Sequence, residues 1–227
     1  MQLSQHDFNC DAARLAQKLL GKVIRHRYRG HWLAARIIET EAYYLHDRAS
    51  HASLGYTDKR RALFMPAGTI YMYYARGKDS LNISAQGEGN AVLIKSAVYY
   101  QDTHCDAHAL QIMQQLNPAS SGEMRPVEKL CSGQTLLCRA LGIRLSDWDQ
   151  QQFCQSDFYI DDVGYRPASI IQTSRLGITA GRDEDLLLRF IDEAEADYCT
   201  KNPLRQRRPN YQRITSGDTT SASDETP

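Results

Sequence analysis

The hydrophobic and polar positions of the first hundred residues predict an antiparallel sheet with one helix. Several short stretches are rich in apolar and aromatic residues, and turn-forming residues separate them. Leu15 and Leu19 instead lie four residues apart and precede Gly21, which is typical of a helix that ends there. The predicted elements are a helix over residues 11–20, a hairpin of strands 22–28 and 32–44 around Arg29-Gly30, strands 69–75 and 80–86 joined by a turn at 76–79, and a strand over 91–100.

The second half of the chain shows fewer regular patterns. Ser132 is a candidate N-cap for a helix that continues to about Leu141, and Gly142 follows it as a stop signal. Ile170-Ile171 and residues 186–191 have the composition of two late strands. The order of these elements favours a mixed α/β fold of the α+β kind.

Two segments are too polar to predict helices or strands. Residues 46–61 are expected to form a loop. Residues 215–227, TSGDTTSASDETP, are almost devoid of apolar side chains and are expected to form a disordered acidic tail. Because no repeat and no internal linker is visible, a single domain over residues 1–214 is the simplest prediction.

Composition adds a distribution of charge to this picture. The 227 residues are 42% hydrophobic, which is enough for a sizeable core, and their formal net charge is zero. Residues 22–36 and 201–213 each contain five lysines or arginines and no acidic residue. Such local basic segments suit a polyanion that meets one face of the protein, and the alternative is an ordinary solvated surface.

The chain shows no sign of a membrane or secretory destination. No apolar run approaches the ~20 residues that a membrane span requires, and the polar start MQLSQHDFNC does not resemble a signal peptide. The six cysteines form no C-x-x-C pair and are expected to be reduced and mostly packed. We therefore expect an intracellular, cytoplasmic protein without a membrane partner.

The segment RIIETEAYY places two carboxylates and a tyrosine at the end of an apolar strand. Side chains alternate along a strand, so Glu39, Glu41 and Tyr43 are expected to share one face. A carboxylate in such a position can act as a general base. The alternative is that each glutamate pairs with an arginine or lysine across the sheet.

The segment TIYMYYARGKDSLNIS, residues 69–84, combines aromatic and basic side chains. Tyr71 and Tyr73 are expected to share a strand face beside a small basic turn. Aromatic rings next to basic groups suit stacking on nucleic-acid bases and attraction of phosphates. Because tyrosine is also a favoured strand residue, an ordinary hairpin is the alternative.

The histidines do not match a common metal site. His46 and His51 form one group, and His104, Cys105 and His108 form another, but neither has a recognised zinc spacing. The sequence also lacks a P-loop, and its glycines do not stand where a dinucleotide-binding fold needs them. No metal and no cofactor are therefore expected.

Several motifs occur together and in a fixed order. They are E-T-E-A-Y at 39–43, His51, P-x-G-T-I-Y-x-Y at 66–73, L-N-I-S at 81–84, K-L-C-S-G at 129–133 and L-C-R-A-L-G-I at 137–143. With them the chain resembles the alkyladenine, or 3-methylpurine, DNA glycosylase family from about residue 11 to about residue 190. The resemblance implies a compact α+β fold with an antiparallel sheet, flanking helices and a protruding β-hairpin. It also implies excision of alkylated and some deaminated purines from DNA without a metal.

The resemblance implies a role for each residue of a base-binding site. Glu41 corresponds to the general base that activates water for attack on C1′ of a flipped nucleotide, and Glu39 to a framing carboxylate. The residues that correspond to the pocket around the flipped base are Tyr43, His51, Tyr73, Asn82 and Lys95. The aromatic members would restore the stacking that the base loses on leaving the helix. Asn82 would exclude normal guanine, and Lys95 stands where the family commonly has arginine.

The hairpin tip departs from the family pattern. The family places a bulky tyrosine before a glycine there, to fill the gap that the flipped nucleotide leaves. Here the tip reads Y-A-R-G-K-D, so Arg76 precedes Gly77 in the position of that wedge, and the nearby Lys78 is expected to hold a phosphate. The alternative is that Arg76 contacts only the DNA backbone and that Tyr74 or another loop supplies the wedge.

The expected partner is double-stranded DNA that contains a damaged purine, bound by a monomer. A water nucleophile implies a monofunctional glycosylase, because strand cleavage would need an amine that forms a Schiff base. Candidate substrates are 3-methyladenine, 7-methylguanine, hypoxanthine and ethenoadenine. Two other classes stay open: a nucleic-acid-binding module without activity, and a Glu/His metallohydrolase.

Overall fold

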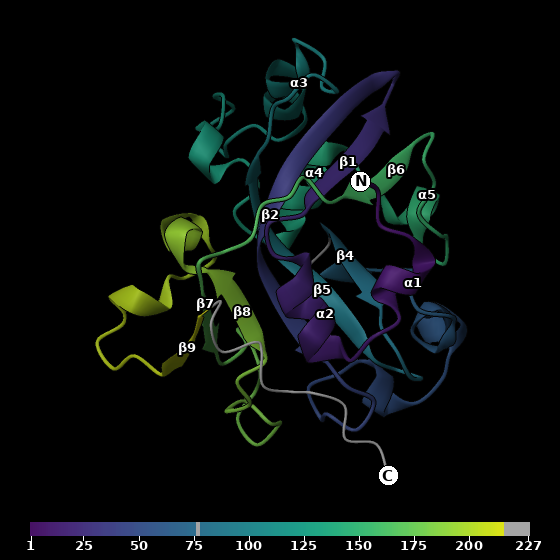
Figure 1. The fold of residues 1–227 in the computed structure, drawn as a ribbon, viewed down its shortest axis with the longest axis vertical. Coiled ribbons are helices and arrows are strands. Elements are labelled where there is room, and N and C mark those ends of the chain that lie inside the picture. Colours follow the sequence, from purple (N-terminus) through teal and green to yellow (C-terminus); the bar gives the residue numbers. More distant parts are fainter. Residues whose placement is uncertain (76–77, 216–227) are drawn as a thin grey trace.

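Nine strands form one antiparallel sheet within residues 1–75 and 78–215, which the computed structural model describes (Figure 1). The strands are β1 (Val23–Tyr28), β2 (His31–Tyr43), β3 (Ile70–Ala75), β4 (Lys78–Ser84), β5 (Ala91–Tyr99), β6 (Phe158–Asp161), β7 (Ser169–Thr173), β8 (Arg189–Asp192) and β9 (Tyr211–Thr215). Their order along the main path is β3-β4-β5-β2-β8-β7-β9, while β1 pairs with both β2 and β6. The sequence prediction of an α+β domain with an antiparallel sheet is confirmed.

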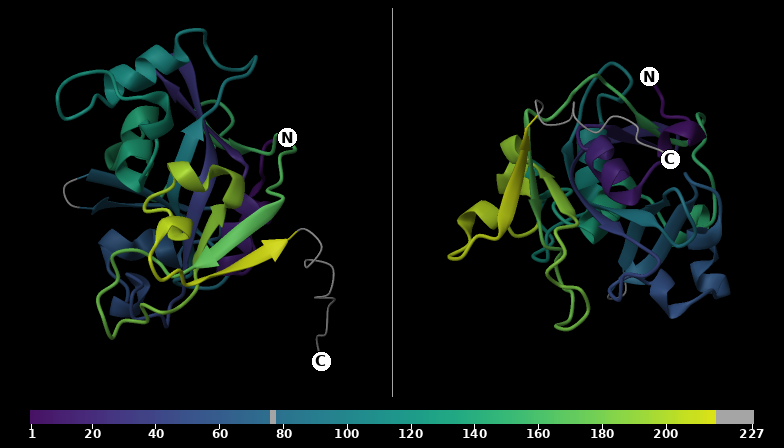
Figure 2. Two further views of the ribbon diagram at one scale, coloured as in Figure 1. Left: turned by 90° about the vertical axis from the view of Figure 1, so that its left-hand side faces the viewer. Right: turned by 60° about the horizontal axis from the view of Figure 1, so that its bottom comes forward.

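Short helices cover the sheet and connect its strands. The α-helices are α1 (Gln5–Phe8), α2 (Ala12–Leu19), α3 (Ala109–Leu116), α4 (Gln134–Leu141) and α5 (Leu145–Trp148). The 3₁₀ helices are η1 (Ala52–Leu54), η2 (Asp58–Phe64), η3 (Val127–Lys129), η4 (Glu193–Tyr198) and η5 (Pro203–Arg205). In Figure 1, α2 lies in front of β2 and β5. In the left view of Figure 2, the paired strands β3 and β4 project from the body of the domain, as the predicted hairpin requires.

The long strand β2 is the centre of the sheet. It pairs with β1 near its start, with β8 near its end, and with β5 along most of its length. The predicted hairpin of β1 and β2 is confirmed, and its turn residues Arg29 and Gly30 have φ of 50° and 88°. Two successive positive φ values give a turn whose twist matches that of the two strands.

The register between β2 and β5 shifts twice, on either side of Glu39. Ile37 pairs with Ala97, Glu39 with Ser96 and Thr40 with Ile94, so Ile38 and Lys95 each have no direct partner across this strand pair. Such irregularities change the direction of side chains and are frequent beside active sites. Here the shift allows the neighbouring residues Lys95 and Ser96 to bind two different carboxylates on β2.

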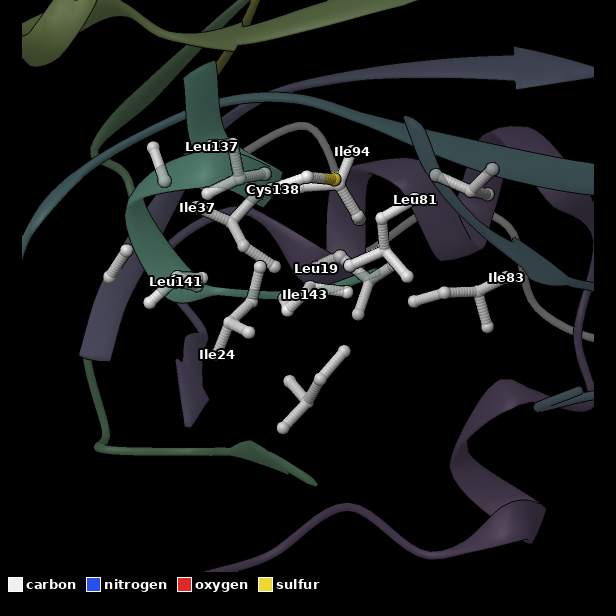
Figure 3. Packing of buried hydrophobic residues seen from close by; sticks show 14 of the residues in the cluster. Leu19, Ile24, Ile37, Leu81, Ile83, Ile94, Leu137, Cys138, Leu141 and Ile143 are labelled. Atoms are coloured by element: carbon white, nitrogen blue, oxygen red, sulfur yellow. The ribbon is translucent and has the colours of Figure 1, made fainter. Parts of the chain in front are cut away.

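The hydrophobic core joins the sheet to α2 and α4. Leu19 of α2, Ile24 of β1 and Leu137 of α4 belong to one buried cluster that also includes residues of β2, β4 and β5 (Figure 3). Asp11 caps α2 by accepting a hydrogen bond from Arg14 N at 3.0 Å. Gly142 ends α4 with φ of 68°, and a Cβ there would lie 2.6 Å from the Tyr28 ring, so only glycine fits without a shift.

Several boundaries differ from the sequence predictions. The expected loop 46–61 contains η1 and the first part of η2, because short 3₁₀ turns have almost no periodic signal. The expected turn at 76–79 is shorter, since Lys78 and Asp79 already belong to β4 and pair with β3. Gly133 rather than Ser132 is the N-cap of α4. The helix α3 and the strands β6 and β9 had not been predicted.

Most of the first basic segment is neutralised inside the fold. Lys22 and Arg25 are buried, and Lys22 pairs with Asp162 at 3.2 Å while Arg25 pairs with Asp161 at 3.0 Å. Arg36 reaches Asp192 at 3.4 Å. Residues 22–36 therefore supply internal ion pairs rather than a continuous basic surface.

The fully buried pair of Glu39 and Arg189 joins β2 to β8. Arg189 Nε donates to Glu39 at 2.6 Å, and both side chains are excluded from solvent. Arg189 also donates to the carbonyl oxygen of Thr200. Removal of one partner from such a pair leaves a buried charge without compensation.

We predict that Arg189→Met lowers the free energy of unfolding by about 3–5 kcal/mol, measured by urea denaturation, because Glu39 would lose its counter-charge. Lys18→Met is the matched control: it removes a half-exposed pair with Asp7 at 2.9 Å and should change stability by less than about 1 kcal/mol. Equal effects of the two substitutions would contradict the importance of the buried pair.

Candidate active site

An open cleft with a volume of about 770 Å³ lies between the β3–β4 pair, η1, the start of α4 and the segment after β7. Its lining combines aromatic, polar and basic side chains with a few aliphatic ones. The residues that line it are Tyr43, Ala49, Ser50, His51, Leu54, Leu63, Tyr71, Tyr73, Lys78, Asn82, Ala91, Leu93, Lys95, Gly133, Gln134, Thr135, Leu176, Gly177, Ile178, Thr179, Arg182 and Thr200. A cleft of this size accommodates a flat organic group of the size of a nucleobase.

One wall of the cleft is aromatic. The rings of His51 and Tyr73 meet edge to face with centroids 4.4 Å apart, and Tyr71 stacks on Tyr73 at 5.7 Å. His51 Nδ1 shares a hydrogen bond with the Tyr71 hydroxyl at 2.9 Å. Partial desolvation of the ring lowers the pKa of His51 below its ordinary value, and the charges of Arg60 and Arg182 lower it further. His51 therefore presents a neutral ring to the cleft near neutral pH.

Glu41 lies directly behind the residues that line the cleft. Its side chain is fully buried, and it accepts hydrogen bonds from the Tyr43 hydroxyl at 2.8 Å and from the Leu176 backbone N–H at 3.2 Å. Lys95 Nζ lies 3.3 Å from its Oε1. Donors from three different segments thus fix the orientation of this carboxylate.

Tyr43 is clamped between Glu41 and Arg175. The Arg175 guanidinium lies 4.6 Å from the centroid of the Tyr43 ring, and Arg175 also binds Asp47 and the Ala42 carbonyl oxygen, the latter at 3.1 Å. Burial and the neighbouring Glu41 carboxylate raise the pKa of Tyr43 well above its ordinary value. The hydroxyl consequently keeps its proton and remains a donor to Glu41.

Asn82 and two lysines complete the polar lining. Asn82 is buried, and its Nδ2 donates to the Tyr71 carbonyl oxygen at 3.1 Å, which fixes the side chain on β4. Lys95 is almost buried beside Glu41, whereas Lys78 is exposed. These cations, with the exposed Arg182, make the polar part of the cleft basic.

The two glutamates of E-T-E-A-Y have different environments although their partners lie on the same face of the sheet. Thr40 between them points to the other side and donates to Ala16 in α2 at 2.9 Å. The alternative that each glutamate pairs with a basic residue across the sheet is confirmed for both, with Arg189 on β8 and Lys95 on β5. Glu39 also accepts from Thr200 N at 2.8 Å and from Ser96 Oγ. Glu41 alone has a partner, Tyr43, that faces the cleft as an aromatic ring.

The structure brings most of the predicted site residues together. Those that line the cleft are Tyr43, His51, Tyr73, Asn82, Lys95 and Lys78, and Glu41 is bonded to two of them. Arg76 and Gly77 lie outside the described residues, so the wedge remains a prediction. Sequence reasoning missed Gln134, Arg175, Leu176, Arg182 and Thr200, which come from distant segments and carry no local motif.

The histidine and cysteine groups do not converge. No group of three or more His, Cys, Asp or Glu side chains with a geometry fit for a metal occurs among the described residues. All six cysteines are free.

Among the described residues, no helix combines the length and the apolar character needed to cross a membrane.

An antiparallel sheet that carries an aromatic, basic cleft with a carboxylate immediately behind it is the arrangement expected of an enzyme that acts on a single unstacked base. Comparison with known proteins agrees with this class. A family model described as "Methylpurine-DNA glycosylase (MPG)" matches residues 6–196. The chain therefore belongs to the methylpurine-DNA glycosylase family, which comprises base-excising enzymes of DNA repair.

Individual relatives cover most of the chain. A Pseudomonas syringae protein named "Putative 3-methyladenine DNA glycosylase" is 59% identical over 204 residues, which are 90% of this chain and 92% of the relative. A Pseudomonas aeruginosa protein of the same name is 59% identical over 199 residues, 88% of this chain and 83% of its own length. The mouse "DNA-3-methyladenine glycosylase" is 34% identical over 198 residues, 83% of this chain and 58% of its own.

We predict that Arg175→Lys slows base excision by roughly 2- to 30-fold while the protein stays folded. Lysine keeps a charge for Asp47, but it loses the planar stack on Tyr43, a contact worth about 0.5–2 kcal/mol. Single-turnover excision at saturating enzyme is the measurement. Arg48→Lys is the matched control, because Arg48 is exposed and pairs with Asp183 at 2.9 Å. An unchanged rate for the Arg175 variant would show that the stack does not position Tyr43.

Proposed function

We propose that this protein removes alkylated and some deaminated purines from double-stranded DNA by hydrolysing the N-glycosidic bond, and leaves an abasic site. The candidate substrates are 3-methyladenine, 7-methylguanine, hypoxanthine and ethenoadenine. The observation that carries the proposal is the Glu41 carboxylate, held by three donors directly behind an aromatic cleft. We further propose that the protein acts as a monomer inside the cell, where its substrate DNA lies.

Base recognition would use the aromatic wall and Tyr43. A flipped purine that enters the cleft loses stacking with its neighbours in DNA and regains it on Tyr43, His51 and Tyr73. An alkyl group at N3 or N7 gives the purine a positive charge, which the faces of the tyrosine rings attract. The neutral state of His51 avoids repulsion of such a cation.

The chemical step would use water and Glu41. The water oxygen forms a bond to C1′ as the bond between C1′ and the purine nitrogen breaks, and the bonding electrons leave with the purine. Glu41 accepts the proton of the water. A cationic purine leaves as a neutral base, so this step needs little help from a general acid.

A monofunctional reaction is proposed because neither cleft lysine is placed as an obvious nucleophile. Lys95 is paired with Glu41, and Lys78 is exposed on the β4 side of the cleft. An intact strand at the abasic site after excision would support the proposal, and strand cleavage that borohydride traps on the protein would contradict it.

The two competing classes, a DNA-binding module without activity and a metallohydrolase, predict different results in an excision assay. A DNA-binding module without activity would bind methylated duplex DNA but release no free base. A metallohydrolase would lose its activity in chelator, whereas the proposed reaction uses only Glu41 and water. Release of free purine from methylated DNA, measured with and without chelator, therefore distinguishes all three.

We predict that Glu41→Gln reduces excision by ~10²–10⁴-fold, because the amide keeps the shape of the carboxylate but cannot accept the proton. The measurement is release of free base from methylated duplex DNA under single-turnover conditions, with DNA binding measured in parallel. Glu39→Gln is the comparison: it should lower stability through Arg189 but leave the rate per folded molecule much less affected. Near-normal turnover of the Glu41 variant would remove this residue from the mechanism.

We predict that Asn82→Ser raises the release of undamaged guanine and 7-methylguanine relative to 3-methyladenine. The shorter side chain widens the cleft at β4, where the exocyclic amine of guanine would otherwise meet the asparagine. The ratio of release rates across these three bases is the measurement. A ratio equal to that of the parent protein would exclude a steric role for Asn82.

A further inference from the structure

The second basic segment forms a surface beside the cleft. Lys201, Arg205, Arg207 and Arg208 line a groove of about 630 Å³ together with Lys129, and we call residues 201–208 the basic extension. The family match ends at residue 196, so the basic extension lies beyond the part of the chain that the family defines.

Most of these charges are not neutralised within the fold. Arg205 pairs with Asp197 at 2.9 Å, but within the described residues Lys201, Arg207, Arg208 and Lys129 form no ion pair. All four are exposed. The first basic segment provides the contrast, because three of its five basic side chains are engaged with internal acids.

Hydrogen bonds to Glu39 on β2 and Arg189 on β8 hold the backbone at the start of the basic extension. Thr200 lines the cleft and donates its N–H to Glu39 at 2.8 Å, and Arg189 donates to the Lys201 carbonyl oxygen at 3.3 Å. Asn202 caps η5 by accepting from Leu204 N at 2.9 Å, and Pro203 is buried. The cations therefore project from an ordered segment that begins at the edge of the cleft.

Pairing of β9 with β7 holds the other end of this segment. Five residue pairs from Ser169↔Thr215 to Thr173↔Tyr211 join the two strands at the edge of the sheet. In the left view of Figure 2, the yellow C-terminal segments lie on the face turned to the viewer, and β3 and β4 project at one side of it. A duplex that presents a base to the cleft can thus continue along this face.

We propose that the basic extension binds the phosphate backbone of duplex DNA on one side of the damaged base, with Lys201, Arg207 and Arg208 as the principal contacts. This inference rests on the proposed function only in that the cleft receives its base from DNA. Contacts of this kind carry no sequence information, but they raise affinity and set the position of the protein on the duplex. That suits an enzyme that must search undamaged DNA for rare lesions.

The test compares the salt dependence of binding to a short undamaged duplex for the parent protein and the variant Lys201→Asn/Arg207→Ala/Arg208→Ala. Asparagine is used at Lys201 because its φ of 55° is left-handed, which asparagine tolerates. Each lost phosphate contact lowers the slope of log Kd against log salt by about 0.9, so three contacts predict a decrease of two to three units. An unchanged slope would overturn the proposal.

The matched control is Arg29→Asn/Arg14→Ala/Arg27→Ala. It also removes three exposed cations that form no ion pair in the described part of the chain, including one at a left-handed residue with φ of 50°. The turn at Arg29 lies at the end of β2 opposite Tyr43, roughly 40 Å away at ~3.3 Å per residue. The control should change the slope by less than one unit. If the control changes the salt slope as much as the test variant does, the slope reports only the net charge of the protein. That result would contradict a specific DNA-binding surface at the basic extension.

Two further measurements separate the possible failures. Single-turnover excision at saturating enzyme should be unchanged in the test variant, because none of its three residues contacts Glu41 or Tyr43. If neither the parent protein nor the test variant excises bases but their salt slopes still differ, the proposed function is refuted. Phosphate binding by the basic extension is not refuted by that result. The second variant is Arg207→Glu/Arg208→Glu, whose unfolding is measured alongside its DNA affinity. A variant that folds normally and binds DNA with normal affinity would refute phosphate binding by the basic extension.

Discussion

The burial of two carboxylates on the central strand is the constraint on which the rest of the structure depends. Glu39 and Glu41 are both excluded from solvent on β2, and a buried charge is strongly unfavourable unless a counter-charge and hydrogen bonds accompany it. The counter-charges come from the two strands that flank β2, with Arg189 on β8 and Lys95 on β5. The order of strands β5-β2-β8 is therefore also the arrangement that neutralises the site.

The same constraint gives the two carboxylates different surroundings, because Glu39 is enclosed by the fold and Glu41 borders the cleft. Glu39 is enclosed by Arg189, Ser96 and the backbone of Thr200, all of which are fixed parts of the fold. Glu41 instead accepts from Tyr43, whose ring lines the cleft. Two identical residue types two positions apart thus acquire different chemistry from their neighbours alone.

The segment after β7 links several parts of the site. Arg175 stacks on Tyr43 and binds Asp47, and the next residue, Leu176, donates its backbone N–H to Glu41. Further along, Asp183 pairs with Arg48 near the start of the loop that carries His51. A single connection therefore holds the Glu41 carboxylate, the Tyr43 ring and one rim of the cleft. Movement of this segment would change all three together.

Sequence alone determined the helix α2, the β1–β2 hairpin, the strands β3 to β5, and the motif residues that converge on the cleft, because each has a local signal in periodicity, turn residues or motif. It could not supply Arg189, Arg175 or Leu176, which lie more than a hundred residues from their glutamate or tyrosine partners. Nor could it reveal that Lys95 and Ser96, neighbours on β5, bind different carboxylates, since strict alternation would place them on opposite faces. That outcome depends on two register shifts between β2 and β5, which arise only when the strands pair. The sequence also showed two basic segments with five cations each. Only the tertiary structure decided that three cations of the first pair with Asp161, Asp162 and Asp192. In the second, Arg205 and Arg213 are paired, whereas Lys201, Arg207 and Arg208 are exposed and form no ion pair within the described residues.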